Sequence, residues 1–427
     1  MNTKDLILDV IAEKCYMGRN ELRDDMTLEG DLFLDSLGFM TIVVELEKKL
    51  QELLPLAELK ISVRSTVGEI CTSVQEYLKR ISKEARSLPI CFPPPMYFSL
   101  HVAAALSMIL AEGENEDWFY NNFIQASFYN DYDSKAKSHK YCVYPAMEMR
   151  PGQMAAGKYI AQTHVDLEVF NMKADSLYEN IKLFINQGYY VSCVADVSRI
   201  KGTRYEERSF LLHEVMIFGY DDALETLDIL DFDDKQAINR IKIASKDLWE
   251  AFTSPELLKI FQGNVNNSVI LYRRKKADFT FDFGLVRELL RDYLDSYNSS
   301  RRYSLLLPCD ENSTWGIGTY DKITEYLEHR EERLDVRLFH AFYEHKKLMF
   351  DRFRYMKQKG LYHAEDELLH GMEENMQGAE TVKLMAMKYN IKPQEQTIEQ
   401  MTLKLDGIKN REICLYERIL RGNGEGR

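Results

Sequence analysis

The sequence predicts a multi-domain protein: an all-α four-helix domain, then an α+β domain, then a helical C-terminal region. Residues 2–82 carry apolar residues at helical spacing, and residues 189–231 contain three strand-like runs that follow a buried helix. The part after residue 275 shows apolar stripes at steps of three and four. The expected boundaries are 1–82 for the first domain, 83–97 for a Pro-rich linker, 98–275 for the second domain and 276–427 for the helical region.

The composition excludes several classes of protein. The 427 residues include 55 basic and 68 acidic side chains, a net charge of −13, which argues against a nucleic-acid partner because phosphate neutralisation needs a basic face. No apolar run is long enough for a membrane span, and acids interrupt the first apolar run, so we expect no membrane and a cytoplasmic location. The seven cysteines lack CxxC spacing, which predicts neither disulfides nor a metal site.

The first domain opens with an amphipathic helix over 5–15, followed by a long acidic loop over 16–35. The next helix begins at Asp35-Ser36-Leu37, where Asp35 is a good N-cap and Ser36 lies on the exposed first turn. A phosphodiester on Ser36 would lie at the positive end of the helix dipole. A closing helix over 66–80 has a capping box of Thr66 and Glu69.

The segment LFLDSLGFMTIVVELEKKL, with the closing TVGEI helix, resembles acyl and peptidyl carrier proteins over residues 2–82. The resemblance implies that Ser36 carries a covalent 4'-phosphopantetheine, with Asp35 and Leu37 as its neighbours in the attachment motif. It also implies two partners, a phosphopantetheinyl transferase and an acyl-loading enzyme of the adenylation or acyl-activating type. Pro89 and the run 93–95 then predict a domain boundary and a semi-rigid spacer.

The second domain begins with the small, apolar helix HVAAALSMILAEG and continues with strand-like runs at 189–197, 211–219 and 226–231. His213 and Asp231 lie on two neighbouring antiparallel runs. A carboxylate bonded to one imidazole nitrogen would leave the other nitrogen basic. The alternative interpretation is a structural strand histidine and a turn aspartate.

The order of elements and the pattern H-x-V-x-x-x-G-Y-D-D resemble papain-like folds, particularly the double-glycine leader peptidases and the butirosin-pathway acyltransferase family. The resemblance implies that His213 is the base and Asp231 its orienting residue; WGIGTYDKITEYL at 315–327 extends it. Two features depart from the pattern: His101 stands where relatives carry the nucleophilic Cys at the helix start, and their upstream oxyanion Gln is not found.

Three explanations of this departure stay open. Another nucleophile replaces the missing one, with Cys91, Ser99 and Cys193 as candidates. Alternatively, an amine attacks the acyl group directly, with His213 as base and His101 as a second base or oxyanion donor. Otherwise the fold is an inactive scaffold that holds the acyl arm or a partner.

The predicted activity is transfer of an acyl or aminoacyl group from the phosphopantetheine thioester to an amine acceptor, which forms an amide in specialised-metabolite biosynthesis. Hydrolysis by a thioesterase would be the same chemistry with water as acceptor. The alternative of another class is a non-catalytic carrier fused to an inactive papain-like binding scaffold.

The helical region carries two apolar stripes that are typical of helix packing. A core is the simpler interpretation, and a substrate-pocket wall or the surface of a homodimer is the functional one. His340, His345, His363 and His370 lack metal-ligand spacing. The stripes consist of Phe339, Phe342, Met349, Phe350, Phe353 and Met356, and of Ile398, Met401, Leu405, Ile408, Leu415 and Ile419.

Overall fold

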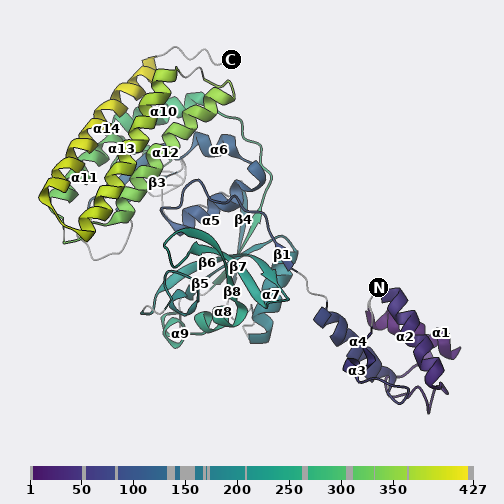
Figure 1. Ribbon diagram of the computed structural model, residues 1–427. Coiled ribbons are helices and arrows are strands. Elements are labelled where there is room, and N and C mark those ends of the chain that lie inside the picture. Colours follow the sequence, from purple (N-terminus) through teal and green to yellow (C-terminus); the bar gives the residue numbers. More distant parts are fainter. Residues whose placement is uncertain are drawn as a thin grey trace. The chain divides into compact units, whose positions relative to one another are not determined.

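A computed structural model shows two compact units (Figure 1). The first comprises Met1–Ala85 and Asp221–Leu224, and the second comprises Arg86–Tyr220 and Glu225–Arg427. The second unit therefore contains both the sheet-rich middle of the chain and the helical C-terminal part. The structure describes residues 3–50, 54–81, 85–131, 140–144, 159–166, 170, 174–206, 209–261, 268–303, 311–330, 332–362 and 365–421. His363 and Cys309 lie outside these residues.

The first unit is helical, as the sequence predicts. Its core is a cluster of aliphatic side chains in which Ile7, Val10, Ile42 and Val67 are almost fully buried. Its helices are α1 (Thr3–Cys15), α2 (Ser36–Leu50), α3 (Leu56–Leu59) and α4 (Val67–Ile81), with the 3-10 turn η1 (Arg19–Glu21).

Two predicted caps fix the starts of α2 and α4. The Asp35 carboxylate accepts the backbone N–H of Gly38 at 2.8 Å, so the helix starts at Ser36. The Thr66 N–H donates to the Glu69 carboxylate at 2.9 Å, and the Glu69 N–H donates to Thr66 Oγ1 at 3.1 Å. This reciprocal pair is the predicted capping box.

The second unit contains two antiparallel sheets in its described part. The larger has the strand order β4-β9-β5-β6-β7-β8, with β1 beside β6, and the smaller has the order β10-β2-β3. The predicted strand runs form β5, β6 and β7. The strands are β1 (Ala85–Ser87), β2 (Gln125–Tyr129), β3 (Tyr141–Tyr144), β4 (Ile160–Asp166), β5 (Tyr190–Asp196), β6 (Leu212–Asp221), β7 (Thr226–Phe232), β8 (Ile238–Ala244), β9 (Ser268–Arg274) and β10 (Ser313–Trp315).

The helix α5 (Leu100–Ile109) is the apolar helix expected at the start of the second domain. Every residue of α5 except His101 is buried. This burial fixes the helix and leaves His101, on its first turn, as the side chain that reaches outward. The other short helices are α6 (Glu116–Asn121), α7 (Ala174–Asn186), α8 (Ser245–Phe252) and α9 (Pro255–Phe261), with 3-10 turns η2 (Ala111–Gly113) and η3 (Val197–Arg199).

The C-terminal helices lie side by side in Figure 1 and bury both predicted stripes. Of the stripe residues, Phe350 alone is only partly buried. The stripes are thus core, as the simpler interpretation held. The helices are α10 (Phe283–Leu294), α11 (Thr319–Glu328), α12 (Val336–Gln358), α13 (Asp366–Ile391) and α14 (Glu395–Arg421), with 3-10 turns η4 (Ser299–Tyr303) and η5 (Gly316–Gly318).

A buried ion pair joins α12 to α14. Lys346 Nζ donates to the two carboxylate oxygens of Glu412 at 2.9 and 2.8 Å, and both side chains are 1% exposed. The hydroxyls of Tyr320 and Tyr416 also donate to Glu412, at 2.7 and 2.6 Å. The added hydrogen bonds offset the large desolvation cost of the two charges.

The Pro-rich segment departs from the expected spacer. Residues from Arg86 onward belong to the second unit, and the Leu88 N–H donates to the Phe218 carbonyl at 2.7 Å. The Glu344 carboxylate on α12 accepts the N–H groups of Tyr97 and Phe98, both at 2.8 Å. The second half of the segment is therefore a fixed part of the unit, because its backbone groups find partners there.

Candidate functional site

Ser36, the serine expected to carry a prosthetic group, is exposed at the surface of the first unit. Ser36 is the first residue of α2, and the side chains of Asp35, Ser36 and Leu37 are all exposed. A bulky phosphodiester on Ser36 Oγ would therefore face solvent at a helix N-terminus, where backbone N–H groups and the dipole favour an anion. Nearby on α2, Leu37, Met40 and Val44 expose 75%, 43% and 56% of their surface, an apolar strip beside the serine.

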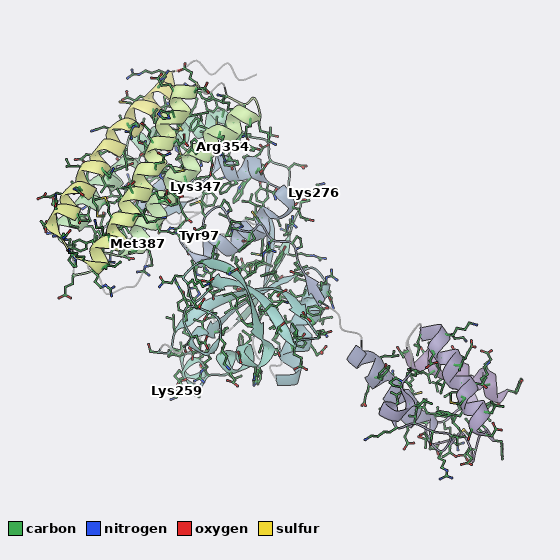
Figure 2. The ribbon with its side chains drawn as sticks, viewed as in Figure 1. Tyr97, Lys259, Lys276, Lys347, Arg354 and Met387 are labelled. Carbon is green, nitrogen blue, oxygen red and sulfur yellow. The ribbon has the colours of Figure 1, made fainter. Side chains whose placement is uncertain are left out.

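The second unit contains a cavity of about 1730 Å³. Its walls come from the segment before α5, the strands β2 and β3, the loop that holds Arg204, the ends of β6 to β8, and the helices α12 and α13. Figure 2 labels four of its lining residues, Tyr97, Lys347, Arg354 and Met387, where these helices approach the segment before α5. Both His101 and His213 line this cavity, so the structure brings two of the predicted site residues together.

His101 is paired with a carboxylate that the sequence analysis did not single out. Its Nδ1 bonds to Glu214 Oε2, and the Ser192 hydroxyl donates to Glu214 Oε1 at 2.5 Å. Ser192 and Glu214 lie diagonally across the β5–β6 pair, since Ser192 is opposite Met216. The carboxylate holds the His101 ring, and Nε2 is left as its second polar atom.

His213 has its ring fixed differently. Its Nδ1 lies 3.1 Å from the backbone carbonyl of Glu214. A carbonyl only accepts, so Nδ1 carries the hydrogen in this bond and Nε2 of the neutral ring has the lone pair. The ring of Tyr205 lies 5.4 Å from that of His213, centroid to centroid.

The two histidines have pKa shifts of opposite sign. The hydrogen bond to Glu214 raises the pKa of His101 above its ordinary value, against the effect of burial. Burial lowers the pKa of His213, and the nearby charges of His101 and Arg204 lower it further. His101 therefore keeps its proton to higher pH than an ordinary imidazole and His213 releases its proton at lower pH, which is the pattern of an acid and a base in one site.

Asp231 does not orient His213. Its Oδ1 accepts the Phe232 N–H at 2.6 Å, and its Oδ2 has no hydrogen-bond partner. Asp231 is fully buried on β7, opposite Asn239 of β8, and its carboxylate makes no bond to the His213 ring. Burial raises the pKa of Asp231 to about 7.

The candidate nucleophiles differ in their access to the cavity. Cys193 is buried within β5 and Cys91 lies in the Pro-rich segment, and neither lines the cavity. Burial raises the pKa of both thiols, the opposite of what activates a thiol. Ser99 precedes α5 and lines the cavity, as does Cys142 on β3, which sequence reasoning missed.

One further residue positions the cavity wall. Glu344 is 2% exposed, and its carboxylate holds the backbone N–H groups of Tyr97 and Phe98 and lies 3.2 Å from His340 Nε2. It therefore ties α12 to the segment that leads into His101. In the sequence, Glu344 appears only as one acid within an apolar helix stripe, and this gives no signal of its distant partner.

The described residues give no support for a metal or a membrane span. No group of three or more His, Cys, Asp or Glu side chains that could hold a metal ion occurs among them. Within the same residues, no helix has both the length and the apolar surface needed to cross a bilayer.

Comparison with known proteins identifies the first unit. Residues 5–74 match the family described as "Phosphopantetheine attachment site". The search of curated proteins found no match. Carrier domains of this family are modified by phosphopantetheinyl transferases and loaded by acyl-activating enzymes. Residues 5–74 are therefore a carrier domain, which holds 4'-phosphopantetheine covalently on a serine and serves carrier-dependent biosynthesis.

Proposed function

We propose that the protein is a carrier-dependent acyltransferase that joins an acyl or aminoacyl group to an amine and so forms an amide. The carrier serine is Ser36, the exposed serine at the start of α2. When bound there, 4'-phosphopantetheine supplies a terminal thiol that carries the acyl group. The observation that supports catalysis is the pair His101 and His213, which line one cavity and have pKa shifts of opposite sign.

His213 is the proposed base. Its Nδ1–H is used in the bond to the Glu214 carbonyl, so Nε2 is available to take a proton from the attacking amine. The lowered pKa of His213 keeps the ring neutral at pH 7, which a base requires.

His101 is the proposed acid and oxyanion donor. Its Nδ1 is held by Glu214, and its Nε2–H would donate to the acyl oxygen as negative charge develops there. The raised pKa favours the imidazolium form, which is the stronger donor. As the new C–N bond forms, the C–S bond of the thioester breaks, and the sulfur leaves as the free pantetheine thiol after taking up the proton that His213 removed from the amine. This arrangement needs no protein nucleophile, because a thioester is already an activated acyl donor.

The resemblance to papain-like folds supports this proposal in one respect and limits it in another. A buried helix, α5, precedes an antiparallel sheet, and His213 lies on β6, the order that the resemblance implies. However, His101 occupies the position of the expected nucleophile. That substitution favours the second candidate function, a non-catalytic scaffold that holds an acyl arm.

A single-turnover experiment on the full chain distinguishes the two candidate functions, the acyltransferase and the non-catalytic scaffold. The protein is converted to its phosphopantetheinylated form, loaded with acetyl or aminoacyl groups, and mixed with a panel of amines. Intact mass spectrometry then follows loss of the acyl group. We expect His213→Ala and His101→Gln to slow transfer about 100-fold, the usual contribution of a general acid or base.

His370→Ala is the matched control, because His370 lies on α13 with 72% of its side chain exposed and does not line the cavity. Ser99→Ala and Cys142→Ala test a covalent route, and full activity in both favours direct attack by the amine. Equal rates in wild type, His213→Ala and His101→Gln would refute the catalytic proposal and leave the scaffold.

A further inference from the structure

One arginine beside His213 is held rigidly at the cavity. The Arg204 N–H donates to the Phe232 carbonyl at 3.0 Å, and Thr203 forms a β-bridge with Asp233, so this loop is fastened to β7 and the turn after it. The Arg204 guanidinium lies 4.3 Å from the centre of the Phe232 ring and 4.6 Å from that of Tyr205. Stacking between aromatic faces fixes the plane of a guanidinium in advance of binding.

The charge of Arg204 has no carboxylate partner within ion-pair distance among the described residues. Its Nε is buried and makes no hydrogen bond there, while one of its terminal NH2 groups donates to the hydroxyl of Tyr205. Asp231 acts on Arg204 only through space, and at neutral pH it carries only part of a negative charge because burial raises its pKa to about 7. Lys235, in the turn between β7 and β8, adds a second cation to this end of the cavity.

Other cations of the cavity are already paired. Arg337 donates twice to Asp335, at 2.9 and 2.8 Å. Lys347 and Arg354, on the same helix, share Asp351 at 2.7 and 3.0 Å. The uncompensated positive charge therefore lies near the base rather than along α12.

We propose that the acceptor is an amino carboxylic acid, whose carboxylate binds Arg204 while its nitrogen lies at His213 Nε2. The inference rests on the proposed function, in which His213 is the base for the amine. Arg204 and His213 both line the cavity, and Tyr205 packs against both side chains. A guanidinium binds a carboxylate through two parallel hydrogen bonds, which would orient the amine towards the base.

A phosphodiester is a second anion that Arg204 can bind, because carrier arms contain one. The test therefore compares three probes: glycine, methylamine and pantetheine 4'-phosphate. Glycine is methylamine with an added carboxylate, which also lowers the pKa of the amine. The two rates are therefore compared per neutral amine, and the change of their ratio between wild type and Arg204→Gln isolates the contact of the carboxylate with Arg204.

The first measurement is acyl transfer by the loaded full chain to glycine and to methylamine. We expect wild type to favour glycine about 10- to 100-fold in kcat/KM, the range for hydrogen bonds to a charged group. Arg204→Gln should raise the KM for glycine and reduce the preference to near unity, and Arg204→Lys should retain part of it. Arg354→Gln, which removes a paired cation, should keep the preference; circular dichroism and thermal unfolding check that the variants fold.

The second measurement needs no turnover. The imidazole NMR signals of His213 are followed in the full chain without an acyl group while each probe is added. Glycine should shift them in wild type and not in Arg204→Gln, even if the acyl transfer proposal itself fails. Equal use of glycine and methylamine, or an Arg204-dependent shift with pantetheine 4'-phosphate alone, would overturn the assignment of the acceptor.

Discussion

The pairing of His101 with Glu214 gives the sharpest prediction, and Glu214→Gln is the perturbation. Glutamine keeps the shape of the side chain and removes the charge that raises the pKa of His101. The charge of Glu214 also raises the pKa of His213, but by less than burial lowers it. In Glu214→Gln both pKa values should therefore fall, that of His101 more.

The size of the rate loss expected in Glu214→Gln follows from the exposure of the His101–Glu214 pair. Hydrogen bonds to charged groups contribute roughly 1.5–3 kcal/mol, but 46% of the His101 side chain is exposed, and solvent screens such a pair. We therefore expect the lower part of this range, about 1.5–2 kcal/mol of transition-state stabilisation, or roughly 13- to 30-fold in rate.

The assay is the pH profile of acyl transfer. The proposed reaction needs neutral His213 and protonated His101, so its rate should rise as pH passes the lowered pKa of His213 and fall as pH passes the raised pKa of His101. Glu214→Gln should move the falling limb to lower pH. Ser192→Ala removes only the 2.5 Å hydrogen bond to Glu214 and should move it less.

An unchanged falling limb in Glu214→Gln would refute the role given to this pair. An NMR titration of the His101 ring checks the same shift without turnover, and a pKa that stays the same in the variant would contradict the argument at its first step.

Three further predictions follow from the fold. Ser36→Ala should lose the ~340 Da increment that a phosphopantetheinyl transferase adds, whereas the partly buried Ser73→Ala should keep it, as intact mass spectrometry will show. Lys346→Met should reduce the free energy of unfolding, measured by urea denaturation, by about 3–5 kcal/mol, because it leaves the buried charge of Glu412 without its partner. The double variant Lys346→Met with Glu412→Gln should recover much of this loss. Asp231 has a pKa of about 7 in the folded state against 3.8, so it stabilises the fold at low pH and loses this contribution as pH rises towards 7. Asp231→Asn should therefore gain stability relative to wild type between pH 4 and 8, by up to a few kcal/mol, and a constant difference across that range would contradict the assignment.

Much of the first unit follows from sequence because its signals are local. The cap at Asp35 and the box formed by Thr66 and Glu69 each act within a few residues, and the structure contains both. The apolar stripes on α12 and α14 were also readable, since helical spacing places such residues on one face.

The site in the second unit was only partly predictable. Its two histidines are conspicuous residue types, and both line the cavity. The expected partner of His213 was Asp231 on the next strand, but the Asp231 carboxylate accepts only the N–H of Phe232 and makes no bond to the histidine. Glu214 had one available signal, a charged residue inside the apolar run LLHEVMIFG.

The sequence by itself determined the carrier domain and the residue types that a reaction at the cavity would use, because caps, motifs and helical periodicity depend on neighbours in the chain. Tertiary structure alone decided that Glu214 rather than Asp231 holds a histidine, that Glu344 on α12 anchors the segment before α5, and that Arg204 lies near His213. Some of these contacts join residues that are far apart along the chain, and others depend on strand register. A local sequence pattern predicts neither kind of contact.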